Sequence, residues 1–558
     1  MASKLLHFIA ELQRRRVVHV AGIYVAAALA VWGAADFAFP ALGLDDSAGL
    51  LVLLLTAIGF PVALVLAWIF RASPDLSTPT TASSETPFES SKSGGRKSII
   101  VLPFDNMSPD PGDAYFSDGL TEEIITHLSY IGSLRVISRN SAMVLKGTQK
   151  DTRTIGNELD VQYVLEGSVR KAGSDLRITA QLIDAISDEH LWAEKYDGNL
   201  DDVFSIQETV SHSIAERLKL SLSPKENRLL SARPIRNLPA YECYLRARQD
   251  IWEGTPERLD KAVHDLMIAL DLVGENALIL AGLGYASFQK ANFGHGQDEA
   301  VKESGQYALR ALELDPDCAE AEVVLGASTQ SFFGDQRASI RHLERARRLD
   351  PNNPDAVVWL LNADLLVGRG DQARDLAEVL VELDPLNALS HALKGLMLWH
   401  EGRFDSAVDS CAQAYEMAPD SPPIVMIYST SLARAGRMEE FQRVHEHGLP
   451  PDSAMIRLAL QHQAAAEGDR ERVFELLSDD LERTGRRDCQ FSYLMAGIQS
   501  QIGEIDGALS WLDSAVESGF VNYPVIARVD PLLENLREDP RFRELLDRVE
   551  PEWESYKA

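Results

Sequence analysis

Cysteine is scarce in this sequence and follows no pattern. Only four cysteines occur among 558 residues, and none stands in a CxxC spacing. Structural zinc needs clustered thiolates or imidazoles, and small secreted scaffolds need dense disulfides. The composition therefore argues against a zinc site and against a disulfide framework. We expect small, buried, reduced side chains at Cys243, Cys318, Cys411 and Cys489.

Basic residues are also few relative to acidic ones. The chain has 54 Lys and Arg against 84 Asp and Glu, which gives a formal net charge of −30. Affinity for nucleic acid comes largely from Lys and Arg that displace counterions from phosphates. Nucleic acid is therefore not an expected partner. Because single cores stop growing at roughly 250–300 residues, the length indicates several domains.

Catalytic motifs are missing from the segment 98–222, which has neither GxxxxGK[ST] nor GxSxG. His445 and His447 stand two residues apart, so they do not share a helix face. A metal or phosphate site at one acidic loop is an open interpretation, but Asp also binds its own backbone in turns, and this is the simpler one. The aspartates concerned are Asp105, Asp110, Asp113 and Asp118. We expect no catalytic, cofactor-binding or metal-binding residues, and hence no enzyme.

Two long apolar runs are present near the N-terminus, at residues 17–39 and 49–70. Each has about the 20 residues that a helix needs to cross a bilayer. The preceding residues 1–16 are basic, whereas the short loop between the runs has two aspartates and no Lys or Arg. The positive-inside rule then predicts a two-helix membrane anchor (17–71), with both chain ends in the cytoplasm. A cleaved signal peptide at 1–38, with a periplasmic body, is the alternative.

Residues 72–97 are dominated by Ser, Thr, Pro and Gly. Such a stretch buries too little apolar surface to offset the entropy of ordering. It is typical of a flexible tether.

The segment 98–222 alternates between strand and helix patterns. Ser98–Phe104 is a short apolar run that suits a buried strand. Leu120–Ile131 has helical periodicity, and Ser117 or Asp118 can cap it. The later patterns complete the order β-α-β-α-β-β-β-α, which predicts an α/β domain with a mixed sheet covered by helices.

Sequence motifs in this segment carry a family resemblance. VLPFDN, YFSDGLTEEI, LRVISR, VQYVLEGSVR, LRITAQLIDA and HLWAEKYD occur in this order over about 125 residues. They resemble the TolB amino-terminal-like domain, which is related to FlgO- and CsgG-type domains. In bacterial multidomain proteins this domain often stands between a membrane segment and tetratricopeptide (TPR) repeats. Such proteins often begin with an adenylate cyclase, winged-helix or kinase domain. Because only sixteen residues precede the first apolar run, we expect no such effector domain here.

The strongest periodicity of the chain lies in residues 237–520. Gly334, Gly368, Gly402 and Gly436 are each 34 residues apart. Prolines that follow LELD, RRLD, VELD and YEMA repeat at nearly the same interval. This period is the TPR signature, in which glycine ends the first helix of each pair and proline stops the second. We predict an all-α solenoid of seven or eight helix pairs, with C-terminal capping helices at 521–558 that bury Phe542, Leu545 and Leu546.

Stacked helix pairs form a concave groove lined by the first helix of each pair, which suits a protein or peptide partner. The repeat places five side chains in this groove, and Trp399 has inter-repeat core as an equal alternative. They are Asn362, Leu365, Leu396, Trp399 and Thr430.

The sequence thus favours a membrane-anchored, non-catalytic scaffold that binds a protein partner through the TPR groove. The alternative is a sensor whose TolB-like domain binds a small ligand or nucleotide, as the resemblance to modules of cyclase-type signalling proteins implies. No cofactor is expected, and self-association stays open.

Overall fold

The structure is a computed structural model of the 558-residue chain, and it describes residues 96–231, 235–253, 255–292, 297–445 and 453–557. The expected membrane spans at 17–39 and 49–70 lie outside these ranges, as does nearly all of the tether at 72–97. Within the described ranges, no helix combines the length and the apolar character that crossing a bilayer requires.

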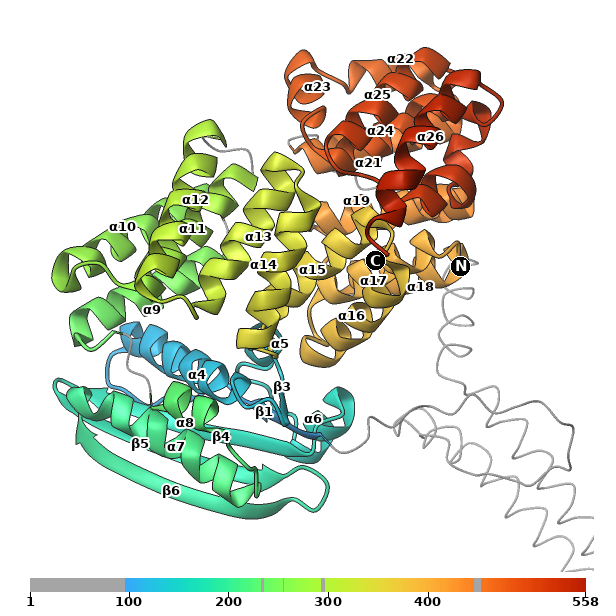
Figure 1. Cartoon of the computed structure of the whole chain (residues 1–558). Coiled ribbons are helices and arrows are strands. Elements are labelled where there is room, and N and C mark those ends of the chain that lie inside the picture. The colour runs from blue at the N-terminus through green and yellow to red at the C-terminus, as the bar shows by residue number, and fades with distance from the viewer. Residues whose placement is uncertain (1–95, 232–234, 254, 293–296, 446–452, 558) are drawn as a thin grey trace, which may run out of the picture. The chain divides into compact units, whose positions relative to one another are not determined.

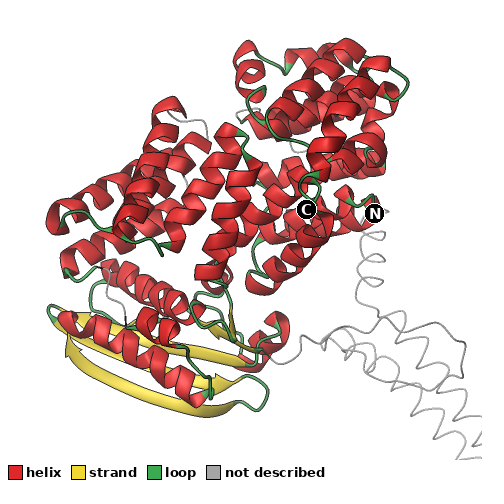
Figure 2. Ribbon diagram, viewed as in Figure 1, coloured by secondary structure: helices red, strands yellow, loops and turns green. Residues whose placement is uncertain are grey.

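The first folded region, called the α/β module below, contains the mixed sheet that the sequence predicts (Figure 2). The strand order is β3-β1-β4-β5-β6, with the short β2 paired to β4. The β3-β1-β4 part is parallel and the β4-β5-β6 part is antiparallel. Within β1, Ile99, Ile100 and Val101 form a fully buried apolar run, as is usual for parallel strands. The strands are β1 (Lys97–Val101), β2 (Asp105–Asn106), β3 (Leu134–Val136), β4 (Tyr163–Ala172), β5 (Asp175–Asp184) and β6 (Glu189–Asn199).

Helix α4 (Ala114–Ser129) begins six residues before the predicted start. The expected cap at Ser117 or Asp118 is therefore wrong. Phe116 is buried and extends the apolar face by one turn, and Asp118 lies inside the helix, where its Oδ1 pairs with Lys146 Nζ at 2.6 Å. The other helices of the module are η1 (Pro111–Asp113), α5 (Arg139–Val144), α6 (Thr152–Leu159), η2 (Leu200–Asp202), α7 (Val203–Arg217) and α8 (Pro224–Leu230).

The second region, called the array below, is a stack of helical hairpins, as the period predicts (Figure 1). The first helices of the pairs are called inner helices. The glycines that follow them, from Gly334 to Gly503 in the 34-residue series, all have φ between 65° and 79°. An L side chain is strained in this left-handed region, which explains why the series is glycine. The hairpins are α9 (Leu238–Glu253) with α10 (Pro256–Val273), α11 (Ala277–Asn292) with α12 (Gln297–Leu314), α13 (Ala319–Phe333) with α14 (Gln336–Leu349), α15 (Pro354–Val367) with α16 (Gly370–Leu383), α17 (Ala388–His400) with α18 (Phe404–Met417), α19 (Pro422–Ala435) with α20 (Met438–His445), α21 (Ala454–Glu467) with α22 (Arg470–Glu475), and α24 (Cys489–Gln501) with α25 (Ile505–Glu517), while α23 (Asp479–Gly485) precedes the last pair.

Close approach of the two helices in a hairpin depends on small residues. A Cβ on Gly395 would lie 2.3 Å from Cys411 Sγ and 3.0 Å from the Ala407 carbonyl oxygen. Cys411 is fully buried at this contact, and burial raises the pKa of its thiol to about 12. The cysteine is thus a core residue.

The chain ends in a π-helix, η3 (Val525–Val529), a 3-10 helix, η4 (Pro531–Leu536), and α26 (Pro540–Glu554). Phe542 and Leu545 are buried, and Leu546 is partly buried against the same core. This tail does more than cover the last hairpin, because Trp553 Nε1 donates to the Gly368 carbonyl oxygen at the end of α15, at 3.4 Å. The C-terminal residues therefore return to earlier hairpins.

Candidate functional site

The α/β module docks on the loops that join successive hairpins of the array. Asp384 lies in one such loop and is 1% exposed. Its Oδ1 accepts from Ser138 Oγ, from Ser141 Oγ at 2.6 Å and from the Ser141 backbone N–H at 3.1 Å. Ser138 also caps α5, so the module's own helix start is bound to the array. Multiple donors to one buried carboxylate fix the orientation of the two regions.

The preceding loop makes a second set of contacts. Asn352 is 3% exposed. Its Nδ2 donates to the carbonyl oxygens of Ser129 and Leu134 at 2.7 and 3.1 Å, and its Oδ1 accepts from Arg96 Nη2 at 2.9 Å. Asp350 and Asp384 occupy equivalent positions of adjacent repeats, 34 residues apart. The docking thus uses the periodicity of the array.

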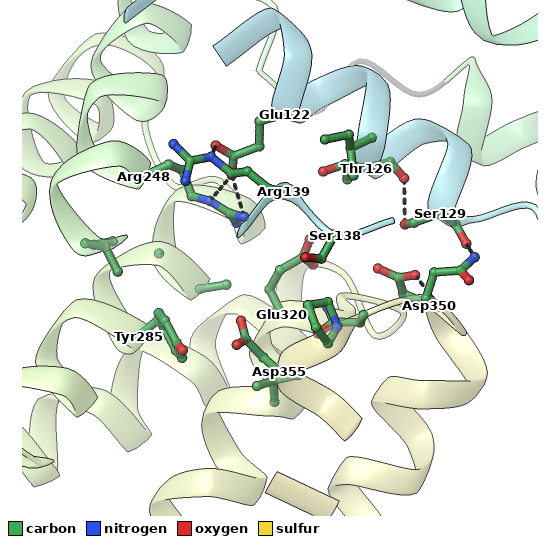
Figure 3. Close-up of a pocket in the computed structure, with 18 of the residues that line it drawn as sticks. Glu122, Thr126, Ser129, Ser138, Arg139, Arg248, Tyr285, Glu320, Asp350 and Asp355 are labelled. Carbon is green, nitrogen blue, oxygen red and sulfur yellow. Dashed lines mark hydrogen bonds and ion pairs between the residues drawn. The ribbon is translucent and has the colours of Figure 1, made fainter. Parts of the chain in front are cut away.

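A charged cluster bridges α4 and α9 beside these loops (Figure 3). Glu122 of α4 accepts from Arg248 Nε of α9 at 2.8 Å and pairs with Arg139 Nε at 2.9 Å. Arg248 also lies against the Tyr244 ring, 5.9 Å from its centroid. Glu122 is only 4% exposed, so two guanidinium groups compensate a buried carboxylate.

These contacts surround a cavity of about 100 Å³ between the module and the array. Carboxylates from the array face it, namely Glu320, Asp350 and Asp355, together with the Tyr285 ring (Figure 3). A neighbouring cleft of about 350 Å³ shares Glu320, Arg248 and Tyr244 with the cavity and continues along α4 to Tyr130. We call the cavity and the cleft together the junction cleft. Its walls are α4 and the inner helices α9, α11 and α13.

Burial perturbs the acids of the junction cleft. Desolvation raises the pKa of Asp350 to about 7, against the hydrogen bonds from Ser129 and Asn352 that lower it. It also raises the pKa of Asp355 to about 6, against the charge of Arg248. Perturbed acids in a cleft are typical of functional sites, although structural networks produce them too.

We expect Asp350→Asn to flatten part of the pH dependence of stability. Folded Asp350 keeps its proton to about pH 7, whereas the unfolded chain releases it near 3.8. The folded state therefore binds more protons between these values, and the free energy of unfolding falls as the pH rises through them. One group contributes a slope of at most about 1.4 kcal/mol per pH unit. Urea unfolding of both chains from pH 4.5 to 8 checks this, and parallel curves would contradict it.

The sequence-predicted groove residues lie elsewhere, against later parts of the same chain. Leu365, Trp399 and Thr430 are each 2% exposed, and the other two are partly exposed. Asn362 Oδ1 accepts from Gln490 Nε2 at 2.6 Å. Leu396 packs at the edge of two core clusters. Trp399 lies in the core, in agreement with the second of its two interpretations. Partner binding by the five residues stays a prediction.

The acidic loop of the module contains turns and ion pairs. Asp110 Oδ1 accepts from the Gly112 backbone N–H at 2.8 Å, as an Asx turn does. Lys171 Nζ lies 3.3 Å from Asp113 Oδ1, and Lys146 pairs with Asp118. Asp105 is exposed in β2. Asp110 thus agrees with the turn interpretation, whereas Asp113 and Asp118 form ion pairs instead.

Sequence reasoning missed the docking residues. The LDP loops were interpreted only as ends of the second helices, and nothing local marks Asp384 as a ligand of two serines 246 and 243 residues away. One available signal was that the next repeat has Ala418 at the position of Asp384. An aspartate that the helix-ending pattern does not require can have another role.

Two family models match separate parts of the chain. Residues 95–216 match the family model of the second domain of HilA/YgeH-like transcriptional regulators. Residues 334–397 match a tetratricopeptide repeat model. A protein named putative adenylate cyclase 3, from Rhizobium meliloti strain 1021, is 47% identical over 156 residues, which are 28% of this chain and 27% of that protein. The match thus spans about a quarter of the relative.

Solved structures that resemble parts of this chain share little sequence with it. A thermophilic TPR protein from Thermus thermophilus is 17% identical, with 34% of this chain and 97% of that chain covered and a TM-score of 0.28. TolB from Acinetobacter baumannii is 20% identical, with 22% and 28% covered and a TM-score of 0.18. With the repeat model, the helical geometry and the glycine series in agreement, the C-terminal region carries tetratricopeptide repeats.

Proposed function

We propose that this chain is a non-catalytic scaffold, anchored in a bacterial inner membrane by residues 17–71, that binds a protein partner through its TPR array. The observation that carries the proposal is the junction cleft, where α4 of the module faces the inner helices α9, α11 and α13. Inner helices of TPR arrays form the concave surface that suits a peptide or a helix. The module narrows this surface and adds its own side chains to it.

The proposed location places both chain ends in the cytoplasm, because basic residues flank the two apolar runs. A fluorescent protein fused to the C-terminus should fold and emit, whereas alkaline phosphatase at the same position should be inactive. The opposite pattern would place the folded regions in the periplasm.

Purification from membranes with matched variants tests the scaffold. Leu278 is partly exposed in the junction cleft, and Leu309 is 57% exposed on α12 outside it. We expect a protein that co-purifies with the unaltered chain to be lost with Leu278→Arg, because the longer side chain would occupy the space that the partner needs. Leu309→Arg should retain it. Equal retention by both variants, or no enriched protein at all, would contradict the proposal.

A second candidate function is a sensor that binds a small ligand in the junction cleft. It is favoured by the 100 Å³ cavity and by the match to a putative adenylate cyclase. The acids that line this cavity, Glu122, Glu320, Asp350 and Asp355, outnumber its cations, Arg139 and Arg248, and oppose phosphate groups. Small cations therefore suit it better than nucleotides do. Thermal-shift measurements on the full chain with diamines and with nucleotides distinguish these two ligand classes. A bound ligand raises the unfolding temperature in proportion to its occupancy.

A further inference from the structure

Residues 518–530, called the return segment below, run along the ends of three successive inner helices. Ser518 lies at Gly334, Asn522 at Gly368 and Val529 at Gly402. A Cβ on Gly334 would lie 2.7 Å from the Ser518 carbonyl oxygen. One stretch of chain therefore follows the 34-residue period of the array from α13 to α17.

Hydrogen bonds join the return segment to the end of α15. The Val521 backbone N–H donates to the Leu366 carbonyl oxygen at 3.0 Å, and Asn522 Nδ2 donates to the Leu365 carbonyl oxygen at 2.7 Å. The last carbonyls of a helix have no partner within the helix. The return segment satisfies them, as a bound peptide would.

Asp530 anchors the other end of the return segment. Arg434 Nη2 donates to Asp530 Oδ2 at 2.7 Å and Tyr493 Oη donates to the same oxygen at 2.8 Å. The Arg434 and Asp530 side chains are both 0% exposed. The Arg434 guanidinium carbon lies 4.3 Å from the centroid of the Trp399 ring, and Arg434 Nη1 donates to the Thr430 carbonyl oxygen at 3.3 Å. This carboxylate pocket is thus built at two of the groove positions that the sequence predicts.

We propose that the return segment is an internal ligand of the TPR groove, and that a protein partner of this surface presents the same chemistry: a stretch with an amide side chain followed, after a short helical turn and eight residues later, by a carboxylate. The proposal rests on the proposed function only in treating the array as the partner-binding part. The groove from α13 to α19 is then closed in the isolated chain, and a partner must displace the return segment to occupy it.

Two features distinguish the return segment from the hairpins of the array. It follows α25, after the last hairpin, and contains a π-helix, a rare conformation that is frequent at functional sites. Its anchor is the Asp530 carboxylate, which the Arg434 guanidinium and the Tyr493 phenol bind. A carboxylate of an incoming partner can make the same contacts. A tethered segment acts at a high effective concentration, so a partner must make further contacts to compete.

The test uses the full chain in detergent and a fluorescein-labelled peptide of residues 516–533. Asp530→Ala weakens the return segment but leaves the pocket intact, so this variant should bind the peptide at least tenfold more tightly than the unaltered chain does. A peptide with Asp530→Ala should bind neither chain. Asp506→Ala, which removes an acid that is 89% exposed and paired with Arg541, is the matched control and should behave as the unaltered chain.

Absence of peptide binding to a folded Asp530→Ala chain would overturn the proposal, as would equal binding of peptides with and without the carboxylate. If the Asp530→Ala chain does not fold, Asn522→Ala, which removes only the amide contacts, is judged by the same criteria. The peptide probe has the chain's own sequence, so a negative peptide result does not bear on partner binding at the junction cleft. A negative co-purification result likewise does not bear on the return segment.

Discussion

Arg434→Met is expected to lower the free energy of unfolding of the full chain by about 3–5 kcal/mol, because it leaves the Asp530 carboxylate buried without its cation. Both side chains are fully buried. Tyr493 alone remains as a side-chain donor to Asp530 Oδ2, and one neutral hydrogen bond does not compensate a buried charge. Urea unfolding followed by circular dichroism measures the loss.

Two further variants make the reason for this loss testable. Arg437, three residues on, forms partly exposed pairs with Glu440 and Asp409. Arg437→Met should therefore cost less than about 1 kcal/mol. Arg434→Met combined with Asp530→Leu should recover much of the loss, since apolar replacement of a buried pair is often neutral. A loss below about 1 kcal/mol for Arg434→Met itself would show that the pair contributes little.

Asp384→Ala is expected to uncouple the module from the array and to cost about 3 kcal/mol, because the variant leaves buried donors of Ser138 and Ser141 without an acceptor. Calorimetry of the full chain should then resolve separate unfolding transitions for the module and the array. The unaltered chain should show a single transition for both. Asp315→Ala is the matched control, because Asp315 holds the same repeat position in an exposed loop. A single transition at unchanged temperature in Asp384→Ala would refute the coupling.

The sequence predicted the elements whose signals are local. The apolar run of β1 and the alternation in β5 gave the strands, and the glycine series gave the hairpins with their left-handed turns. β2, α5 and α8 were missed, because these short elements begin with mostly polar residues and lack the apolar run that marks β1.

Contacts between distant parts of the chain were not predictable in the same way. The repeat placed Thr430 and Trp399 in a groove, but nothing in the repeat shows that residues 518–530 return to it. Likewise, Asp384 fits the helix-ending pattern of every LDP loop, and only the fold brings Ser138 to it. Local propensity determines elements, whereas docking depends on the three-dimensional arrangement of the whole chain.

Hydrogen exchange of the full chain in detergent most directly tests the central claim, that the module packs on the loops between hairpins of the array and that the return segment packs on the ends of the inner helices α13 to α17. The backbone N–H groups of Ser138 and Val521 donate to Leu383 and Leu366 at 2.7 and 3.0 Å, across these two contacts. We predict slow exchange for peptides containing either residue, comparable with that of the hairpin α17–α18. Exchange at the rate of an exposed loop in both peptides would contradict the account.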